Sequence, residues 1–182
     1  MITMNIKTKT FFLSVSTLIL VGLGLHGYSE TQGGTTNGSA QSGTKPSITE
    51  YFSPASTKKM TPDANGFIQR WSLLEPINKP NRGNTVFVDS YLRNAFDTLY
   101  FANQFSIVPK NGEKVKVGEQ ELTWHALESK NFNVKLFRFA SGLEKQMYGV
   151  LFWAVTVVNC PQEMKNVRMA VGSNSASMWW LN

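Results

Sequence analysis

The stretch GVLFWAVTVVN, residues 149–159, decides the fold of this chain. Outside the N-terminal segment it is the most apolar run of the sequence, and it is rich in β-branched residues. A short run of this kind, apolar at nearly every position, is typical of a strand that is covered on both faces. Pro161 follows closely and ends the pattern. We therefore predict a central strand over residues 149–159.

Short apolar runs flank this strand from Phe105 onward, and turn signals separate them every eight to twelve residues. The turn at Asn111-Gly112 is one of the clearest, because Asn-Gly tolerates positive φ. This spacing is typical of an antiparallel sandwich or barrel. The further strands that we expect, with a bulge near Phe137, are Lys114–Val117, Glu121–Leu127, Phe132–Phe137, Asn166–Val171 and Ser177–Leu181.

The part of the chain before Phe105 adds one strand and one helix. Residues 66–77, GFIQRWSLLEPI, have a β-like composition and predict the first strand, which Pro76 ends. Asp89 is a suitable N-cap for a short helix near residues 90–100. Its core face would hold Tyr91, Leu92, Ala95, Phe96 and Leu99, which fall at helical spacings. The predicted fold class is mostly β, an antiparallel β-sandwich with one short helix.

Residues 1–29 have the order of regions that is typical of a secretory signal peptide. Lys7 and Lys9 precede an uncharged apolar stretch, Phe11–Leu25, and the small residues Gly27 and Ser29 follow it. The alternative is an uncleaved membrane anchor, but the apolar run is shorter than the ~20 residues that a spanning helix needs. We expect export to the periplasm or the extracellular space, with no membrane attachment after cleavage.

A polar segment follows the predicted leader. Residues 30–47, ETQGGTTNGSAQSGTKPS, contain no aromatic or branched aliphatic residue, so they cannot bury enough apolar surface to offset their ordering entropy. We predict a flexible linker over residues 30–58 and a single β-sandwich module over residues 59–182. The sequence closes on MWWLN, residues 178–182, in what reads as the outgoing arm of a hairpin. We therefore expect a module that is incomplete at its C-terminus.

Charge and cysteine content exclude several classes of function. The formal net charge is +6, but the Lys and Arg residues are scattered among acids, so no nucleic-acid partner is expected. The single cysteine, Cys160, follows an apolar run, and we interpret it as a small buried hydrophobe. One cysteine and few histidines cannot form a usual structural zinc site, and no calcium or phosphate loop is present, so we expect no metal and no cofactor.

The residues offer little for catalysis. The Gly-x-Ser-x-Gly motif of a nucleophile elbow is absent, and the acids fall mostly in turns and helix starts rather than in a catalytic pair. Ser173 and Ser175 with His125 are the only, poor, candidates for a nucleophile and its base. We interpret His125 as a hydrogen-bonded structural or surface histidine. No residue is assigned a catalytic role.

Aromatic residues are abundant, with five Trp, five Tyr and twelve Phe. Carbohydrate-binding modules use exposed aromatic rings as platforms for the apolar face of a sugar. Trp71 and Trp153 lie in apolar runs and are expected in the core, whereas Trp124 is open to either role. Trp179 and Trp180 must point to opposite faces of a regular strand, so we expect one of them to be exposed or to face a ligand. The candidate ligand-binding residues are Trp124, Trp179, Trp180 and Asn182.

The segment from Glu144 to Asn182 resembles β-sandwich modules of carbohydrate-active enzymes, in which a strand ending in Gly-Ser-Asn leads into Trp-x-Asn-Gly-Lys. Here these motifs read VLFWAVTVVNC, NVRMAVGSNSAS and MWWLN. With FIQRW at 67–71, SYLRNAFDTLYF and ELTWHALESKNFNVKLFRFA, the chain is similar to the N-terminal, non-catalytic region of secreted bacterial acetyl xylan esterases. The resemblance implies a jelly-roll or galactose-binding-like sandwich, acetylated xylan as the polysaccharide partner, and a downstream catalytic domain in full-length relatives. Its motifs are structural, and it carries over no catalytic residue.

The hypothesis is therefore an exported, carbohydrate-associated accessory module with a binding or structural role in xylan degradation. Two alternatives come from other classes of protein. One is a carbohydrate esterase or other hydrolase whose nucleophile the sequence does not reveal. The other is a structural surface or adhesion domain that uses the same sandwich.

Overall fold

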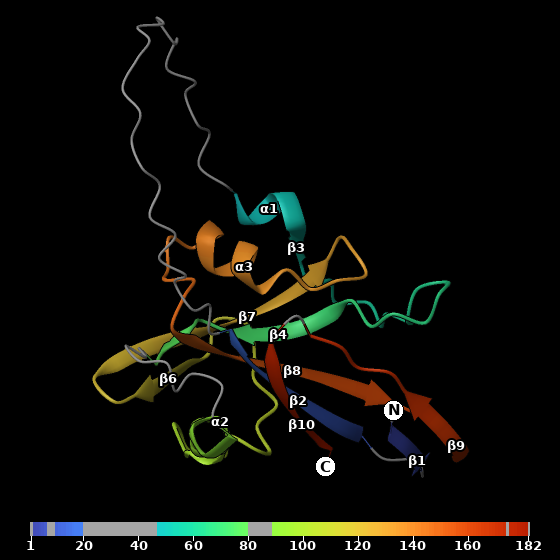
Figure 1. The fold of residues 1–182 in the computed structure, drawn as a ribbon. Coiled ribbons are helices and arrows are strands. Elements are labelled where there is room, and N and C mark those ends of the chain that lie inside the picture. Colours follow the sequence, from blue (N-terminus) through green and yellow to red (C-terminus); the bar gives the residue numbers. More distant parts are fainter. Residues whose placement is uncertain (1, 7–9, 20–46, 80–88, 174, 182) are drawn as a thin grey trace, which may run out of the picture.

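A computed structural model describes residues 2–6, 10–19, 47–79, 89–173 and 175–181. The described part is mostly β, with an antiparallel main sheet of six strands in the order β10-β2-β8-β4-β7-β3 (Figure 1). These strands are β10 (Ala176–Leu181), β2 (Thr10–Ile19), β8 (Val150–Asn159), β4 (Arg70–Leu74), β7 (Gln120–Ser129) and β3 (Phe52–Pro54). Two short strands extend the ladders, β5 (Ile77–Asn78) on β8 and β6 (Lys114–Val117) on β7, while β1 (Ile2–Ile6) and β9 (Met164–Met169) pair separately.

Strand β8 is the central element that its composition predicts. It pairs with β2 along one edge and with β4 and β5 along the other. Its residues from Val150 to Val155 are all at most 3% exposed. Alternate side chains enter two separate cores, because successive residues of a strand point to opposite faces. The prediction of a central strand covered on both faces is confirmed.

Helices cover both faces of the main sheet (Figure 1). Helix α2 (Asp89–Asp97) lies on one face, and the short helices α1 (Ile48–Tyr51) and α3 (Leu136–Gly142) lie on the other. The core on the α2 face includes Trp124, Trp153 and Phe96, and the core on the opposite face includes Phe139 and Phe52. We call these the α2-side core and the α3-side core.

The helix expected near residues 90–100 is present as α2. Ala95 and Phe96 are buried, and Tyr91 and Leu92 pack partly buried against the same core. Leu99 lies two residues beyond the helix end and is 66% exposed, so its predicted place on the core face is wrong.

The strand predicted over residues 132–137 is wrong. Residues 131–135 are irregular, Phe132 is 62% exposed, and α3 begins at Leu136. Phe139 and Ala140 are fully buried, and Leu136 packs against them at the i+3 and i+4 spacing of a helix. The apparent alternation of residues 132–136 therefore reflected chance spacing and not a half-buried strand.

The folded part begins earlier than the predicted boundary at residue 59. Helix α1 and strand β3 lie within the segment predicted as linker, and Phe52 is 2% exposed with its ring edge-on to Phe139. A Cβ at Gly142 of α3 would lie 2.7 Å from the backbone nitrogen of Ile48, so only glycine allows α1 this close to α3. The residues 30–46 of the predicted linker lie outside the described residues.

The other expected strands are found with shifted ends. The first, predicted over residues 66–77, is divided into β4 and β5, and those over Lys114–Val117 and Glu121–Leu127 correspond to β6 and β7. The segments 166–171 and 177–181 correspond to β9 and β10. Cys160 is a buried free thiol, as predicted.

The N-terminal segment takes part in the sheet. Strand β2, which falls within the predicted signal peptide, lies between β8 and β10. Its pairing leaves the prediction of a cleaved leader untested. Among the described residues, no helix has the length and apolar character needed to cross a bilayer.

Candidate functional site

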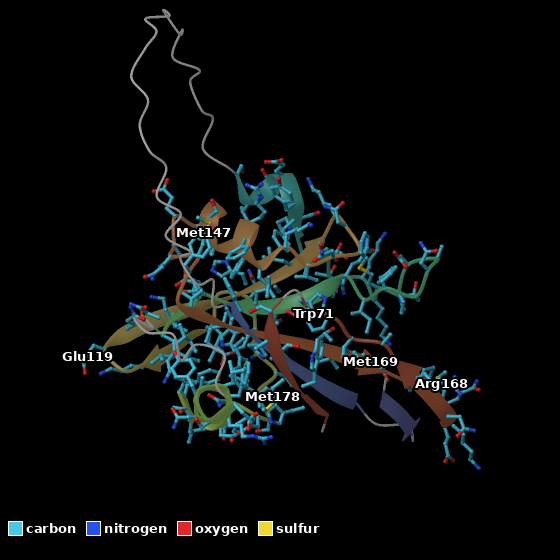
Figure 2. The ribbon with its side chains drawn as sticks, in the orientation of Figure 1. Trp71, Glu119, Met147, Arg168, Met169 and Met178 are labelled. Carbon is cyan, nitrogen blue, oxygen red and sulfur yellow. The ribbon has the colours of Figure 1, made fainter. Side chains whose placement is uncertain are left out.

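A small aromatic pocket lies beside α3. Its volume is about 290 Å³, and its lining residues are Phe137, Arg138, Met147 and Tyr148. Met147 lies next to α3 in Figure 2. The volume is near the lower end of the usual range for small-molecule sites, about 300 Å³. The pocket therefore suits one small ring or one unit of a polymer.

Two rings form the apolar part of this aromatic pocket. The centroids of Phe137 and Tyr148 lie 5.3 Å apart at an interplanar angle of 51°. Tyr148 is 51% exposed, so much of its side chain is accessible to a ligand. Arg138 is exposed, whereas Phe137 is partly buried and packs against the α3-side core while it also lines the pocket.

Arg138 supplies the polar side of the pocket. Its guanidinium lies over the ring of Tyr51 in α1, 5.2 Å from the ring centroid. This cation–π contact orients the side chain while leaving it exposed. The guanidinium carries five N–H donors and no acceptor, so it suits hydroxyl and carbonyl oxygens. Aromatic faces beside fixed donors are the chemistry by which proteins bind sugar rings.

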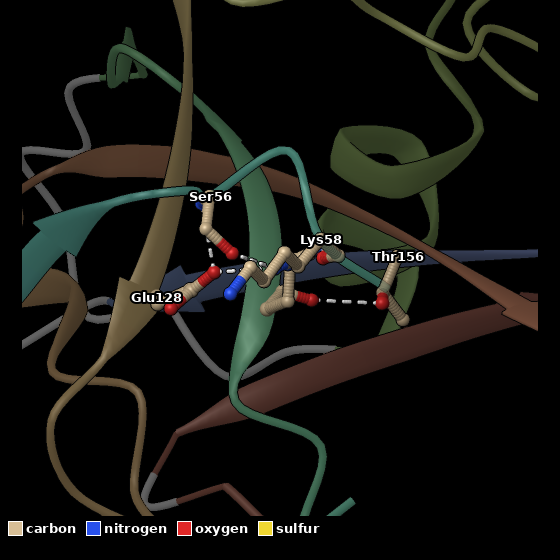
Figure 3. Close-up of polar contacts among 5 residues, drawn as sticks. Ser56, Lys58, Glu128 and Thr156 are labelled. Carbon is tan, nitrogen blue, oxygen red and sulfur yellow. Dashed lines mark hydrogen bonds and ion pairs between the residues drawn. The ribbon is translucent and has the colours of Figure 1, made fainter. Parts of the chain in front are cut away.

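A second, larger groove of about 540 Å³ lies along β4 and the C-terminal half of β8. Its floor includes residues 68–72 and 155–159, and its walls include Met60 and Val108, which are 42% and 49% exposed. Figure 3 shows the polar contacts that hold one wall in place. Arg70 donates to the Lys58 carbonyl at 2.7 Å and to the Ser56 hydroxyl at 2.8 Å, and it forms an ion pair with Glu128. Arg70 thus fixes residues 56–58 beside β4, and the groove is lined by apolar side chains such as Met60 and Val108 together with polar ones such as Gln69 and Asn159.

The carboxylate of Glu128 is stabilised in its charged form. The backbone N–H of Ser56 donates to Oε1 at 2.9 Å, and Arg70 donates to the same oxygen. The pKa of Glu128 is held below its usual value near 4.5. The hydrogen bond from the Ser56 N–H is the largest cause, and the one from Arg70 is the next. A carboxyl with a lowered pKa in the folded state stabilises the fold above the pKa of the unfolded chain, and this stability is lost as the pH falls through the folded pKa.

Replacing Glu128 with Gln should therefore flatten the acid limb of the stability profile. We expect the variant to lose less of its stability than the parent chain when the pH falls from neutral to below about 4.5, because one carboxyl no longer takes up a proton on unfolding. Urea unfolding at a series of pH values measures this difference. Glu119→Gln, at the exposed turn between β6 and β7 (Figure 2), is the matched control and should follow the parent profile. Identical slopes for the Glu128 and Glu119 variants would contradict the prediction.

A third cluster joins Glu75, His125 and Lys145 at the edge of the α3-side core. Glu75 is 8% exposed, and its two carboxylate oxygens lie 3.5 Å from His125 Nε2 and 3.3 Å from Lys145 Nζ. The ring of His125 also packs edge-on against Phe139 at 5.5 Å. The side chain of His125 is mostly buried, but its Nε2 has no hydrogen-bond partner among the described residues, so the hydrogen bond expected of this histidine is not found. The acid beside His125 is Glu75. The hydroxyl of Ser173, the candidate nucleophile, instead accepts a hydrogen bond from the backbone N–H of Ser175 at 3.2 Å.

The aromatic residues that the sequence suggested as ligand-binding do not come together in one site. Trp124 has no exposed surface and packs edge-on against Phe101 in the α2-side core. A ligand-binding role for Trp124 stays a prediction, and it would require its neighbours to move. Trp179 and Trp180 face opposite sides of β10, as expected, but both are partly buried, Trp179 against the α3-side core and Trp180 against Trp153. Asn182 lies outside the described residues.

Sequence reasoning missed the two rings of the aromatic pocket. Phe137 fell in the strand that we predicted wrongly, and Tyr148 lies in the polar segment before β8, where no element was expected. Each ring has a polar or flexible neighbour in the pocket, Arg138 for Phe137 and Met147 for Tyr148. For Tyr148, the available signal was an aromatic residue within a polar, exposed segment.

Within the described part of the chain, no group of three or more His, Cys, Asp or Glu side chains is placed to hold a metal ion. Comparisons with protein-family models, with curated proteins and with solved structures found no match to this chain.

Proposed function

We propose that this protein is an exported, carbohydrate-associated accessory module without catalytic machinery of its own, and that it acts in the degradation of acetylated xylan. The observation that carries the proposal is the aromatic pocket beside α3. Phe137 and Tyr148 offer ring surface, and Arg138 offers N–H donors next to them. This is the combination that binds the apolar face and the oxygens of a sugar.

The pocket chemistry also supports an acetylated ligand. An acetyl ester adds one methyl group and one carbonyl oxygen to a sugar hydroxyl. Met147 is an adaptable apolar side chain that can contact the methyl group, and Arg138 can donate to the carbonyl oxygen. We therefore expect acetylated xylan to bind more tightly than the deacetylated polymer.

Two finer parts of the proposal concern fold and location. We infer that the main sheet belongs to a β-sandwich of the jelly-roll or galactose-binding-like type, and that residues 1–29 direct the chain to the periplasm or the extracellular space. The apolar composition of residues 11–25 supports export. In the proposed setting, a separate esterase domain supplies the chemistry and this module supplies the contact with polysaccharide.

Affinity electrophoresis in gels that contain acetylated xylan tests the binding function. We expect the parent chain to be retarded, and Tyr148→Ala and Phe137→Ala each to weaken binding about tenfold, because each removes one ring worth roughly 1.4 kcal/mol of contact. Phe132→Ala is the matched control, since Phe132 is equally aromatic and 62% exposed but does not line the pocket. It should bind like the parent chain.

Two outcomes would contradict the binding proposal. If no plant polysaccharide changes the migration of the parent chain, the binding proposal is wrong. If Phe132→Ala weakens binding as much as Tyr148→Ala and Phe137→Ala do, the assignment of binding to this pocket is wrong. Capture of a protein partner in the absence of sugar binding would favour the structural surface or adhesion alternative instead. Release of acetate that is lost in His125→Ala would favour the esterase alternative.

A further inference from the structure

Strand β2 fills a position in the sheet that is one strand wide. It pairs antiparallel with β8 over ten residues, from Thr10↔Asn159 to Ile19↔Val150. On its other edge it pairs antiparallel with β10 over six residues, from Leu13↔Leu181 to Leu18↔Ala176. Among the described strands, β10 has no other partner. Strand β2 therefore connects β10 to the rest of the sheet.

The same ten residues lie within the leader that export would remove, so the following argument rests in part on the proposed export. Without residues 1–29, the edge of β8 that faces β2 would lose all of its described strand pairing. That edge belongs to β8, whose residues from Val150 to Val155 are all at most 3% exposed. A long apolar edge with free backbone donors and acceptors is a template for another strand.

Aromatic packing between β8 and β10 fits a spacing of one intervening strand. Trp153 of β8 and Trp180 of β10 stack with centroids 5.2 Å apart and an interplanar angle of 24°, although β2 lies between their strands. By register, Ser16 lies opposite Trp153 and Ser14 lies opposite Trp180. The rings of Trp153 and Trp180 thus stack across β2 at the positions where its sequence has the small residues Ser14 and Ser16.

Direct closure of β10 onto β8 conflicts with this packing. Both strands run antiparallel to β2, so they run parallel to each other. To pair, they would have to approach by one strand spacing, about 4.8 Å, and change to the slanted parallel hydrogen-bond pattern. Trp180 would then lose its contacts with Trp153, Phe96 and Phe105 in their present arrangement.

We propose that the position between β8 and β10 is an acceptor site for an apolar β-strand donated by another polypeptide once the leader has been removed. The segment that fills it in the intact chain, TFFLSVSTLI, defines the chemistry of the donor. The donor is about ten residues long, uncharged, antiparallel to β8, and small at the two alternate positions opposite Trp153 and Trp180. Main-chain hydrogen bonds give the affinity, and the small positions give the specificity.

The test uses the full chain with a specific protease site placed between Ser29 and Glu30. After cleavage in vitro, a fluorescent peptide of residues 10–19 is added, and its uptake is followed by anisotropy and size exclusion. We expect the peptide to exchange with the cleaved leader and to co-elute with the body of the protein. The uncleaved chain should take up much less, because its own strand occupies the site.

Variant peptides test which positions of the donor strand the acceptor site recognises, with no change to the protein. Val15→Pro should weaken uptake roughly tenfold or more, since proline removes a ladder donor and does not fit a central strand. Ser16→Phe should weaken it similarly, because the new ring would lie opposite Trp153. Thr17→Val is the matched control, since residue 17 lies opposite Phe152 on the other face, and it should bind like the parent peptide.

Three results would overturn the acceptor site. They are no uptake by a cleaved chain that remains folded, equal uptake of the Val15→Pro peptide, and a stable dimer of the cleaved chain that takes up no peptide. The export proposal is tested separately by the mass of the chain recovered outside the cytoplasm. Failure of that measurement leaves the in vitro result on the acceptor site unaffected.

Discussion

Replacing Trp153 with alanine is expected to lower the free energy of unfolding by about 3–5 kcal/mol, the range for removing a large aromatic side chain from a core. Trp153 is fully buried in β8. Its ring contacts Phe101 at 5.9 Å, Phe105 at 5.8 Å and Trp180 at 5.2 Å between centroids. The substitution therefore removes a shared partner of three rings and leaves a cavity under α2.

Trp153→Phe separates the loss of packing from the loss of the indole N–H. The Nε1 atom of Trp153 is buried with no hydrogen-bond partner among the described residues, so its removal leaves no donor or acceptor unpaired. We expect the phenylalanine variant to be less destabilised than the alanine variant. Urea titration followed by circular dichroism measures both, with Phe132→Ala as the exposed control that should change stability by about 0.5 kcal/mol or less. A Trp153→Ala variant as stable as this control would show that β8 is not the centre of the core.

Replacing Phe139 with alanine should have an effect of similar size on the opposite face of the sheet, about 3–5 kcal/mol. Phe139 is fully buried, and its ring lies edge-on to Phe52 at 6.2 Å and to His125 at 5.5 Å. Phe139 therefore connects α3 both to β7, through His125, and to the α1–β3 segment, through Phe52. Its loss should loosen both short helices.

Hydrogen exchange and chemical unfolding together measure this effect. We expect a lower unfolding midpoint and faster exchange of amides in residues 47–54 and 136–142. Tyr148→Ala is the control in the same layer, since Tyr148 is 51% exposed and should leave the midpoint nearly unchanged. Slow exchange in both segments of the Phe139 variant would mean that another contact holds them.

Local pattern was sufficient for the elements whose composition and burial agree. Residues 149–159 are apolar at almost every position, and they form a strand that is buried on both faces. The helix near residues 90–100 was predictable for a related reason, because its apolar residues at helical spacing pack on one core. Pattern failed at residues 132–137, where Phe132 and Val134 alternate by chance and the burial of Phe139 selects a helix.

The aromatic pocket could not be read from the sequence for a different reason. Phe137 and Tyr148 are eleven positions apart, and a ring contact between them exists only because α3 packs on the sheet with Phe139 inward. Trp124 shows the converse case. It has the residue type of a binding platform, but its position on β7 places it under Phe101 with no exposed surface.

The sequence by itself determined a mostly β chain with a central strand at residues 149–159, one short helix and an apolar N-terminal segment. Only the tertiary structure decided the partners of these elements: helices on both faces of the sheet, α1 against α3, and residues 10–19 between β8 and β10. The physical reason is that composition and periodicity report how much of a segment is buried, and on which faces. The neighbour that buries it is set by contacts between residues far apart in the chain, such as Trp153 with Trp180 and Phe52 with Phe139.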